Sequence, residues 1–205
     1  PYADVELETT YDYNPDKANQ LLDEAGWVMN ESTGIREKDG EPLNLLLTLE
    51  SDYSATSMPT AEVIKSQLAE VGIDVTIYGT EQMQWYADYL EGKFDLTLWH
   101  SQFAFASPHC WFTPMDSMVP QTPSLPGIEG SDEFLATIKD LTNMVDEQEV
   151  RDTYTYLFNF DIGTALDIPL TYQKDMIVYN TDKISGYTFT GTPYFFDILS
   201  LEPAE

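Results

Sequence analysis

The hydrophobic residues between positions 11 and 27 recur at the three- and four-residue spacing of a helix with one apolar face. An asparagine that can cap the helix precedes a proline in the first turn, and a glycine suited to a left-handed stop follows. The sequence therefore predicts a helix within residues 11–27. It is capped by Asn14, has Pro15 in its first turn, ends at Gly26 and buries Ala18, Leu21, Leu22 and Ala25.

The pattern then alternates between strands and helices. Residues 34–43 are polar and predict a turn with Asp39 and Gly40 at its tip, and the apolar run at 43–49 predicts a strand buried on both faces. Further elements are expected as a helix at 61–71 capped by Thr60 and ended by Gly72, a strand at 73–78, a helix at 82–90 and a strand at 94–99. Strand, helix and strand form a parallel βαβ unit, so the fold class is α/β, a layered mixed sheet flanked by helices.

Residues 100–130 contain five prolines, both histidines and the only cysteine, and they show no periodicity. A long irregular segment inside a compact domain usually has a function, so these residues are interpreted as a functional loop. Ser131 is expected to cap a helix with Phe134, Ile138, Leu141 and Val145 facing inward.

A further helix is predicted at 147–165, with Tyr154, Leu157, Phe158 and Ile162 in register. Residues 168–172 and 176–179 resemble a pair of strands. The aromatic tail at 186–201 gives no clear element.

The charge excludes two classes of partner. The 205 residues carry 36 acidic and 9 basic side chains, for a formal net charge of −27, yet 42% of the residues are hydrophobic. Such a polyanion repels nucleic acid and anionic membrane surfaces, and the hydrophobic content supports a packed core. No window approaches 18 consecutive apolar residues. Because the chain starts at Pro1, it is interpreted as a piece of a longer protein.

Enzymatic motifs are not found: the chain lacks GxxxxGK[ST], GxGxxG and GxSxG. His100 and His109 are nine residues apart, which fits no standard zinc pattern, although Cys110 and Met115 add soft donors that suit nickel, copper or zinc. Two interpretations stay open, a structural role in an aromatic loop and a ligand-binding role. His100 follows a predicted strand, where ligands bind in open α/β sheets.

Several motifs occur in the order seen in one known family. YDYNPDKANQLLDEAGW is followed by GIREKDG, QLAEVGIDV, GKFDL, IPLTY and GY. Together they resemble the family 5 extracellular solute-binding proteins, which serve peptide and nickel ABC importers, and the resemblance covers essentially the whole chain.

The resemblance implies one lobe of a two-lobed periplasmic-binding-protein-like fold of type II, with residues 1–185 as the C-terminal lobe and residues 186–205 as a tail returning toward the hinge and the other lobe. It implies a non-enzymatic protein without a cofactor, located outside the cytoplasm, either periplasmic or lipid-anchored at the cell surface. The implied partners are a small-molecule or metal-chelate ligand, an ABC permease in the membrane and the missing N-terminal lobe, with no nucleic acid.

Within this family the chain resembles the nickel and metallophore branch. Ser107, Pro108 and His109 resemble a Tyr-Asp-Pro-His motif of that branch, with Ala106 and Ser107 replacing Tyr and Asp, and the GTPYFF segment at 191–196 resembles its tail. The residue that ligates nickel in well-known members falls near Gln121, and no histidine lies in 116–130. The expected ligand is therefore nickel or a metal complex with a small chelator, in which His100 or His109 would fill an open coordination position. The expected ligand-binding residues are Tyr86, His100, Phe103, His109 and Thr192.

The expected mechanism is closure of two lobes on the ligand. Tyr86, Phe103, Phe105 and Trp111 are expected to form an aromatic wall, with core packing as the alternative for each. A peptide receptor of the same family is the main alternative function. A metal-dependent hydrolase using both histidines and a carboxylate, and a structural interaction module, are the others.

Overall fold

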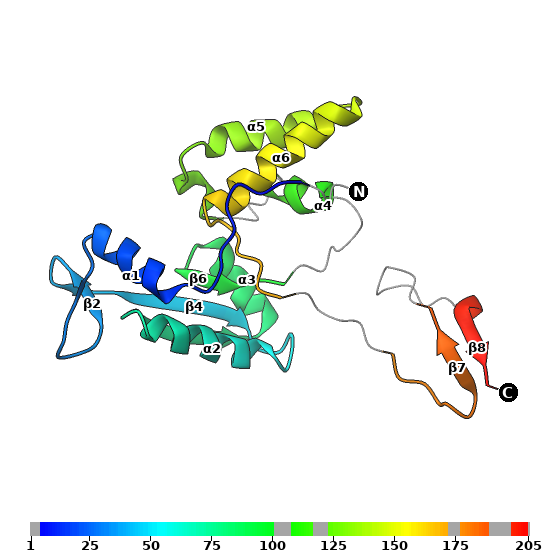
Figure 1. Cartoon of the computed structure of the whole chain (residues 1–205), viewed down its shortest axis with the longest axis horizontal. Helices are drawn as coiled ribbons and strands as arrows, with labels where there is room; N and C mark the ends of the chain where they lie inside the picture. The colour runs from blue at the N-terminus through cyan, green and yellow to red at the C-terminus, as the bar shows by residue number, and fades with distance from the viewer. Residues whose placement is uncertain (1–4, 101–107, 117–122, 172–176, 189–197, 205) are drawn as a thin grey trace.

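The protein is represented by a computed structural model (Figure 1). It describes residues 5–100, 108–116, 123–171, 177–188 and 198–204.

The N-terminal helix forms as the sequence predicts. Helix α1 spans Pro15–Glu24, and the side chain of Asn14 accepts a hydrogen bond of 2.9 Å from the backbone N–H of Lys17. Gly26 adopts a left-handed φ of +87° and ends the helix. The expected apolar face is not buried, however: no residue of α1 is buried and Leu21 is 51% exposed. Periodicity predicted the helix correctly, but the described residues do not cover its apolar side.

A small antiparallel sheet follows, formed by β1 (Val28–Met29), β2 (Arg36–Lys38) and β3 (Glu41–Pro42) in that order. Asp39 and Gly40 have φ values of +55° and +86° at the tip between β2 and β3, which is typical of a two-residue hairpin turn. The predicted turn is confirmed. Its flanking strands were missed, because their polar residues carry no alternating pattern.

The central sheet has three strands that all run parallel. Strands β4 (Asn44–Glu50), β5 (Asp74–Thr80) and β6 (Leu96–Leu98) lie in the order β5-β4-β6. The pairing of β4 with β5 runs from Asn44↔Asp74 to Glu50↔Thr80, which confirms the predicted βαβ unit. On the other side of β4, Leu47 pairs with Leu96 and Leu49 with Leu98.

Helices cover both faces of this sheet. Helix α2 (Ser57–Ala69) places Ala61 against Leu47, Leu49 and Val75. Helix α3 (Gln82–Leu90), predicted with these bounds, lies against the opposite face. There the indole N–H of Trp85 donates a hydrogen bond of 3.1 Å to the hydroxyl of Thr97, which alternates with the core residues of β6.

The expected cap of α2 is wrong. The helix begins three residues before Thr60, whose backbone N–H donates to the carbonyl of Thr56 (2.9 Å). Proline is tolerated in the first turn, so Pro59 does not prevent the earlier start. Gly72 ends the segment with a φ of +82°, as expected.

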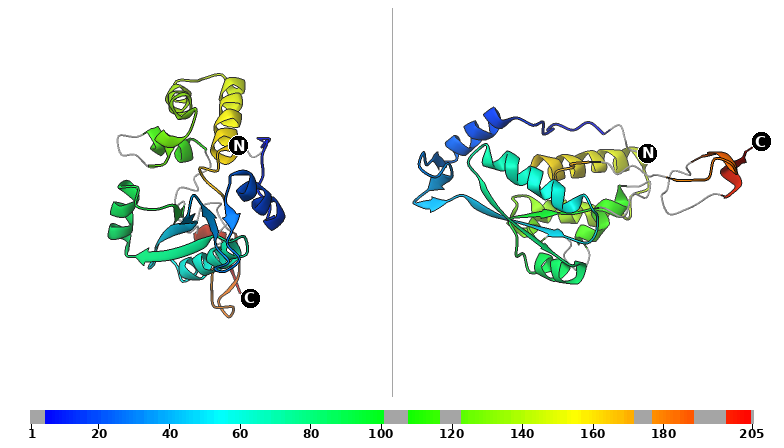
Figure 2. Two further views of the ribbon diagram at one scale, coloured as in Figure 1. Left: turned by 90° about the vertical axis from the view of Figure 1, so that its left-hand side faces the viewer. Right: turned by 90° about the horizontal axis from the view of Figure 1, so that it is seen from below.

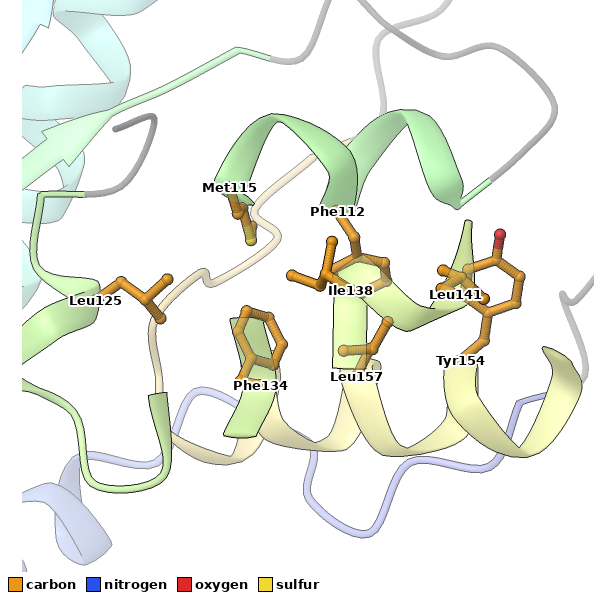
Figure 3. Packing of buried hydrophobic residues seen from close by; sticks show 8 residues of the cluster. All are labelled: Phe112, Met115, Leu125, Phe134, Ile138, Leu141, Tyr154 and Leu157. Carbon is orange, nitrogen blue, oxygen red and sulfur yellow. The ribbon is translucent and has the colours of Figure 1, made fainter. Parts of the chain in front are cut away.

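A second layer consists of helices (Figures 1 and 2). It contains α4 (His109–Phe112), α5 (Ser131–Leu141) and α6 (Glu147–Gly163), with the short 3-10 helices η1 (Thr113–Asp116) and η2 (Leu125–Gly127). Figure 3 shows their shared core, formed by Phe112, Met115, Leu125, Phe134, Ile138, Leu141, Tyr154 and Leu157. The described parts of residues 100–130 are thus short helices that contribute core residues, not an irregular loop throughout.

The ends of α5 differ from the prediction. Ser131 is the first helical residue, and Gly130 in a left-handed conformation occupies the cap position, so Ser131 is not the cap. Phe134, Ile138 and Leu141 are buried as expected, whereas Val145 is 98% exposed because α5 ends at Leu141. Helix α6 is confirmed, with Asp146 as its cap.

The C-terminal expectations were the least accurate. The described residues at 168–171 and 177–179 form no strand, and Ile168 and Val178 are 52% and 96% exposed. The tail instead contains β7 (Ile184–Tyr187) paired antiparallel with β8 (Leu201–Pro203), preceded by the 3-10 helix η3 (Ile198–Ser200). This strand pair lies apart from both layers (Figures 1 and 2). The boundary expected at residue 185 stays a prediction.

Candidate functional site

The carboxyl ends of the three parallel strands meet at one edge of the central sheet. Strand β4 ends at Glu50, β5 ends at Thr80, and His100 follows β6 by two residues. Glu50 and Thr80 are in register, which places both side chains on the same face of the sheet. This is the face that carries Trp85 of α3, because Glu50 and Thr48 alternate with the core leucines that contact α2. In open α/β sheets this edge is where ligands bind.

A carboxylate and an imidazole approach each other at this edge. Oε2 of Glu50 lies 3.6 Å from Nε2 of His100, and their side chains are 7% and 23% exposed. Burial raises the pKa of Glu50, and the charge of Asp52 raises it further. Burial also lowers the pKa of His100, so the imidazole is neutral at neutral pH. The site therefore presents an imidazole nitrogen beside a carboxylate oxygen.

An aromatic cluster surrounds this pair. His100 stacks on Tyr53 with ring planes 12° apart, and its ring centroid lies 6.3 Å from that of Trp85. Trp99 lies 5.0 Å from Trp85 and 4.9 Å from Tyr89 between ring centroids. These contacts fix the plane of the imidazole and surround it with flat apolar surfaces. Such an arrangement can bind a small cargo by ring contact and a few polar atoms.

The structure places one of the expected ligand-binding residues at this edge and a second on the adjacent helix α3. His100 lies at the sheet edge, and Tyr86 is half-buried on α3 with its ring centroid 6.4 Å from that of Tyr89. His109 instead begins α4 in the helical layer, where its carbonyl accepts a hydrogen bond of 2.7 Å from the hydroxyl of Thr113. Phe103 and Thr192 lie outside the described residues, as do Phe105 and Gln121.

Trp111, expected in the aromatic wall, packs against the core of the helical layer. Its indole N–H donates a hydrogen bond of 3.1 Å to Oδ2 of Asp161. Trp111 is therefore a core residue of the helical layer, which was the alternative expected for it.

Sequence reasoning did not single out Glu50, Thr80, Tyr53 or Trp85. One signal was available for Glu50, because a charged residue that ends an otherwise apolar parallel strand lies at the carboxyl edge. The contact with His100 depends on the lateral position of β6 next to β4, and a single sequence does not specify strand order. Trp85 and Tyr53 are ordinary aromatic residues until the fold brings them together.

A pair of carboxyl groups, the buried Asp161 and the half-buried Asp167, lies at the end of α6. Burial, reinforced by the charge of Asp167, raises the pKa of Asp161 to about 8, and burial raises the pKa of Asp167 as well. Among the described residues Oδ1 of Asp161 has no hydrogen-bond donor. The raised pKa keeps a proton on Asp161, which avoids placing a second negative charge beside Asp167 in a buried position. This pair carries no signal in the sequence, where 36 carboxylates look alike.

Two other features of the described part of the chain bear on chemistry. No three histidine, cysteine, aspartate or glutamate side chains in it gather into a potential metal site. A surface cavity of about 540 Å³ between α5 and α6 is lined mainly by acidic and polar side chains, among them Glu133, Asp146, Glu149 and Asp152. It lies in the helical layer and not at the sheet edge.

Comparison with known proteins gives a family match over more than half of the chain. The family of bacterial extracellular solute-binding proteins, family 5 (middle region), matches residues 1–122. The nickel-binding periplasmic protein of Escherichia coli (strain K12) is 28% identical over 181 residues, which are 87% of this chain and 34% of that protein. The oligopeptide-binding protein OppA of Lactococcus lactis subsp. lactis (strain IL1403) is 42% identical over 69 residues, 34% of this chain and 11% of that protein.

A solved structure matches the fold over nearly the entire chain. NikA from Brucella suis, crystallised in complex with Fe(III)-EDTA, has a TM-score of 0.88 at 29% identity and covers 99% of this chain and 40% of its own. The α/β fold class is thereby confirmed. The chain spans about a third of the length of the E. coli relative that it matches.

Proposed function

We propose, from the premise that this chain belongs to the family 5 extracellular solute-binding proteins, that it forms part of the substrate-binding component of an ABC importer. Its cargo is nickel, carried as a complex with a small chelator. The component binds its cargo and delivers it to the permease, without catalysing a reaction. The matched relative is periplasmic, which supports a location outside the cytoplasm. In the described part of the chain no helix combines the length and apolar character needed to cross a bilayer.

One observation carries the nickel assignment. The neutral imidazole of His100 lies at the carboxyl edge of the parallel sheet, next to the buried carboxylate of Glu50. Imidazole nitrogen is a good ligand for nickel. Two relatives with matches over most of the chain support this cargo, one a nickel-binding protein and the other a structure with a metal chelate. The aromatic rings beside His100 offer surfaces for the organic part of a chelate.

The second candidate cargo is an oligopeptide. It is favoured by the higher identity of the matched OppA segment, 42% over 69 residues. An extended peptide would use backbone hydrogen bonds and pockets for its side chains. The two cargoes make opposite predictions for His100, because backbone recognition does not need an imidazole.

In this proposal residues 1–185 form most of one lobe and residues 186–205 lead toward the hinge. Closure of the second lobe would complete the site. Tyr86, His100, Phe103, His109 and Thr192 remain the proposed contacts, and in the described structure the rings of Tyr89 and Trp85 link Tyr86 to His100.

The test is calorimetric titration of the full-length protein with three probes: Ni(II) alone, Ni(II) with excess L-histidine, and a pool of di- and tripeptides. We expect tight binding with Ni(II) plus L-histidine and none with the peptide pool. His109→Ala tests the second proposed histidine, which lies in the helical layer and not at the sheet edge. Unchanged nickel binding in His109→Ala would leave His100 as the histidine that contacts the cargo, and weaker binding would place His109 in the site. Binding of peptides without any response to nickel would contradict the nickel assignment and favour the peptide receptor.

A further inference from the structure

We propose that Glu50 and His100 together form a two-residue binding site for a divalent transition-metal ion at the carboxyl edge of the parallel sheet. The inference rests on the proposed nickel cargo and adds a residue, Glu50, for which the sequence alone gave no role. It assigns each side chain one coordination position through Oε2 and Nε2.

The first observation is an unsatisfied buried carboxylate. The side chain of Glu50 is only 7% exposed, and among the described residues its Oε2 has no hydrogen-bond partner. A buried charge without a partner is costly to a fold, so such a group usually has a counterpart that completes it. The nearby carboxylate Asp52 is of the same sign and adds to the cost. A cation fits this position, and an anionic or apolar ligand does not.

The second observation is the distance between the two candidate donors. Metal bonds to imidazole nitrogen and carboxylate oxygen are about 2.0–2.2 Å long, so two ligands at a tetrahedral angle lie about 3.4 Å apart. Oε2 of Glu50 and Nε2 of His100 are 3.6 Å apart, beyond a direct hydrogen bond. The separation therefore suits one metal ion between the two atoms, with an adjustment of a few tenths of an ångström.

The third observation is that the imidazole is held in place. Tyr53 stacks on His100 with planes 12° apart, and Trp85 lies on the same face of the sheet. Trp85 is itself fixed by its hydrogen bond to Thr97, whose hydroxyl donates to the carbonyl of Thr48 in β4 (3.3 Å). Donors that are oriented before binding raise metal affinity, as supporting contacts do around known metal ligands.

The remaining coordination positions belong to the cargo. Two protein donors do not saturate a first-row metal, and no group of three donor side chains occurs among the residues that the structure describes. A small chelator carried with the metal would supply the other donors. The hydroxyl of Thr80, in register with Glu50, is also buried and without a hydrogen-bond partner among the described residues, so the polar atoms left unsatisfied by the described residues include one from each of these two neighbouring strands.

The experiment compares four forms of the full-length protein by calorimetry with Ni(II) alone and with Ni(II) plus L-histidine. They are the wild type, Glu50→Gln, His100→Gln and the control Glu62→Gln, which removes an exposed carboxylate from α2 on the other face of the sheet. We expect each of the two site variants to bind Ni(II) at least about tenfold more weakly than wild type. The Glu62→Gln control should match the wild type.

Two further readouts separate coordination from folding. Glu50→Gln removes an unpaired buried charge, so the melting temperature of the unloaded protein should stay the same or rise while nickel binding is lost. X-ray absorption at the nickel edge, recorded with Ni(II) alone, should show imidazole scattering that His100→Gln diminishes. Glu50→Asp, which keeps the charge but shortens the side chain, should bind with intermediate affinity.

The possible failures are distinguishable. If the wild type binds nickel and both site variants bind it as tightly, this inference is wrong and the proposed cargo stands. If the wild type binds peptides and no nickel, the proposed cargo and this inference both fail. A third outcome is that Glu50→Gln weakens the binding of a primary amine such as a dipeptide, whereas His100→Gln does not. In that case the carboxylate recognises an ammonium group, and the proposed metal site is wrong.

Discussion

Trp111 and Asp161 join α4 to α6 through a hydrogen bond of 3.1 Å from the indole N–H to Oδ2 of the carboxyl group. The two residues are 50 positions apart, and Asp161 is only 2% exposed. The second carboxyl oxygen, Oδ1, is buried and has no hydrogen-bond partner among the described residues. The helical layer therefore contains an acid that holds a proton at pH values where most carboxyl groups are ionised.

This pair predicts that the free energy of unfolding falls as pH rises between about 4 and 8. Burial and the charge of Asp167 raise the pKa of Asp161 from 3.8 to about 8 in the folded protein. The folded state thus binds more protons than the unfolded state in this range, and the stability present below pH 4 is lost as pH passes through 8. One such group contributes at most about 1.4 kcal/mol per pH unit. Urea unfolding of the full-length protein at pH 5, 6, 7 and 8 measures the slope.

Asp161→Asn tests whether this acid causes the slope. An asparagine oxygen still accepts from Trp111 but cannot ionise, so the variant should lose less stability than wild type between pH 5 and 8. Asp152→Asn, on the exposed side of the same helix, should keep the wild-type slope. Equal slopes for wild type and Asp161→Asn would contradict the assignment.

The local pattern of the sequence was sufficient for the elements that stabilise themselves locally. Helix α1 has its cap at Asn14 and its stop at Gly26, and α3 follows the predicted bounds, because caps and helical periodicity act within a few residues. The parallel pairing of β4 with β5 also follows from a short crossover with a helical pattern. These signals do not depend on distant parts of the chain.

Features that depend on distant partners were not predictable. The alternating residues at 168–171 form no strand, since an alternating segment becomes a strand only where a neighbour pairs with it. Strands β7 and β8 pair across residues 188–200, and their few apolar residues gave no signal. At the site, His100 was recognised by its place after a strand, whereas Glu50 depended on the order β5-β4-β6.

Arg36 offers a test of the junction between α1 and the sheets. This residue is only 3% exposed, and its guanidinium donates to the carbonyls of Val71 and Trp27 and to the side chains of Asn19 and Asp23. Arg36→Met would leave the carbonyls of Val71 and Trp27 without this donor and should lower the free energy of unfolding by about 2–4 kcal/mol. Denaturant unfolding measures the loss.

The matched variant for this junction is Asp23→Asn. The side chain of Asp23 is 67% exposed, so removing its charge should cost less than about 1 kcal/mol. A large effect of Asp23→Asn together with a small effect of Arg36→Met would show that the ion pair, and not the carbonyl contacts, stabilises the junction.

Alanine substitutions at Gly72 and Gly26 distinguish the stability cost of a strained backbone from the cost of steric crowding. Both have left-handed φ values, +82° and +87°, at which an L residue costs about 1–2 kcal/mol. A Cβ at Gly26 would have its nearest neighbour at 3.7 Å, whereas a Cβ at Gly72 would lie 2.7 Å from Cε of Met29 and 2.9 Å from Cγ of Arg36. Gly72→Ala should therefore destabilise the protein more than Gly26→Ala in thermal unfolding. Equal losses would mean that Met29 moves aside without cost.

Substitutions of two neighbouring residues of α3, Trp85 and Tyr86, should have different effects. The first should lower the stability of the fold, and the second should weaken binding of the cargo. Trp85 is 4% exposed and lies at the centre of the aromatic cluster, so Trp85→Ala should lower the free energy of unfolding by about 3–5 kcal/mol. Tyr86 is half-buried, and its proposed role is contact with the cargo. An aromatic contact contributes about 0.5–1.5 kcal/mol, so Tyr86→Ala should raise the Kd of the nickel chelate about two- to tenfold while the unfolding transition changes little. Calorimetry and urea unfolding of both variants give the two quantities. Loss of stability in Tyr86→Ala with an unchanged Kd would place Tyr86 in the core and remove it from the proposed site.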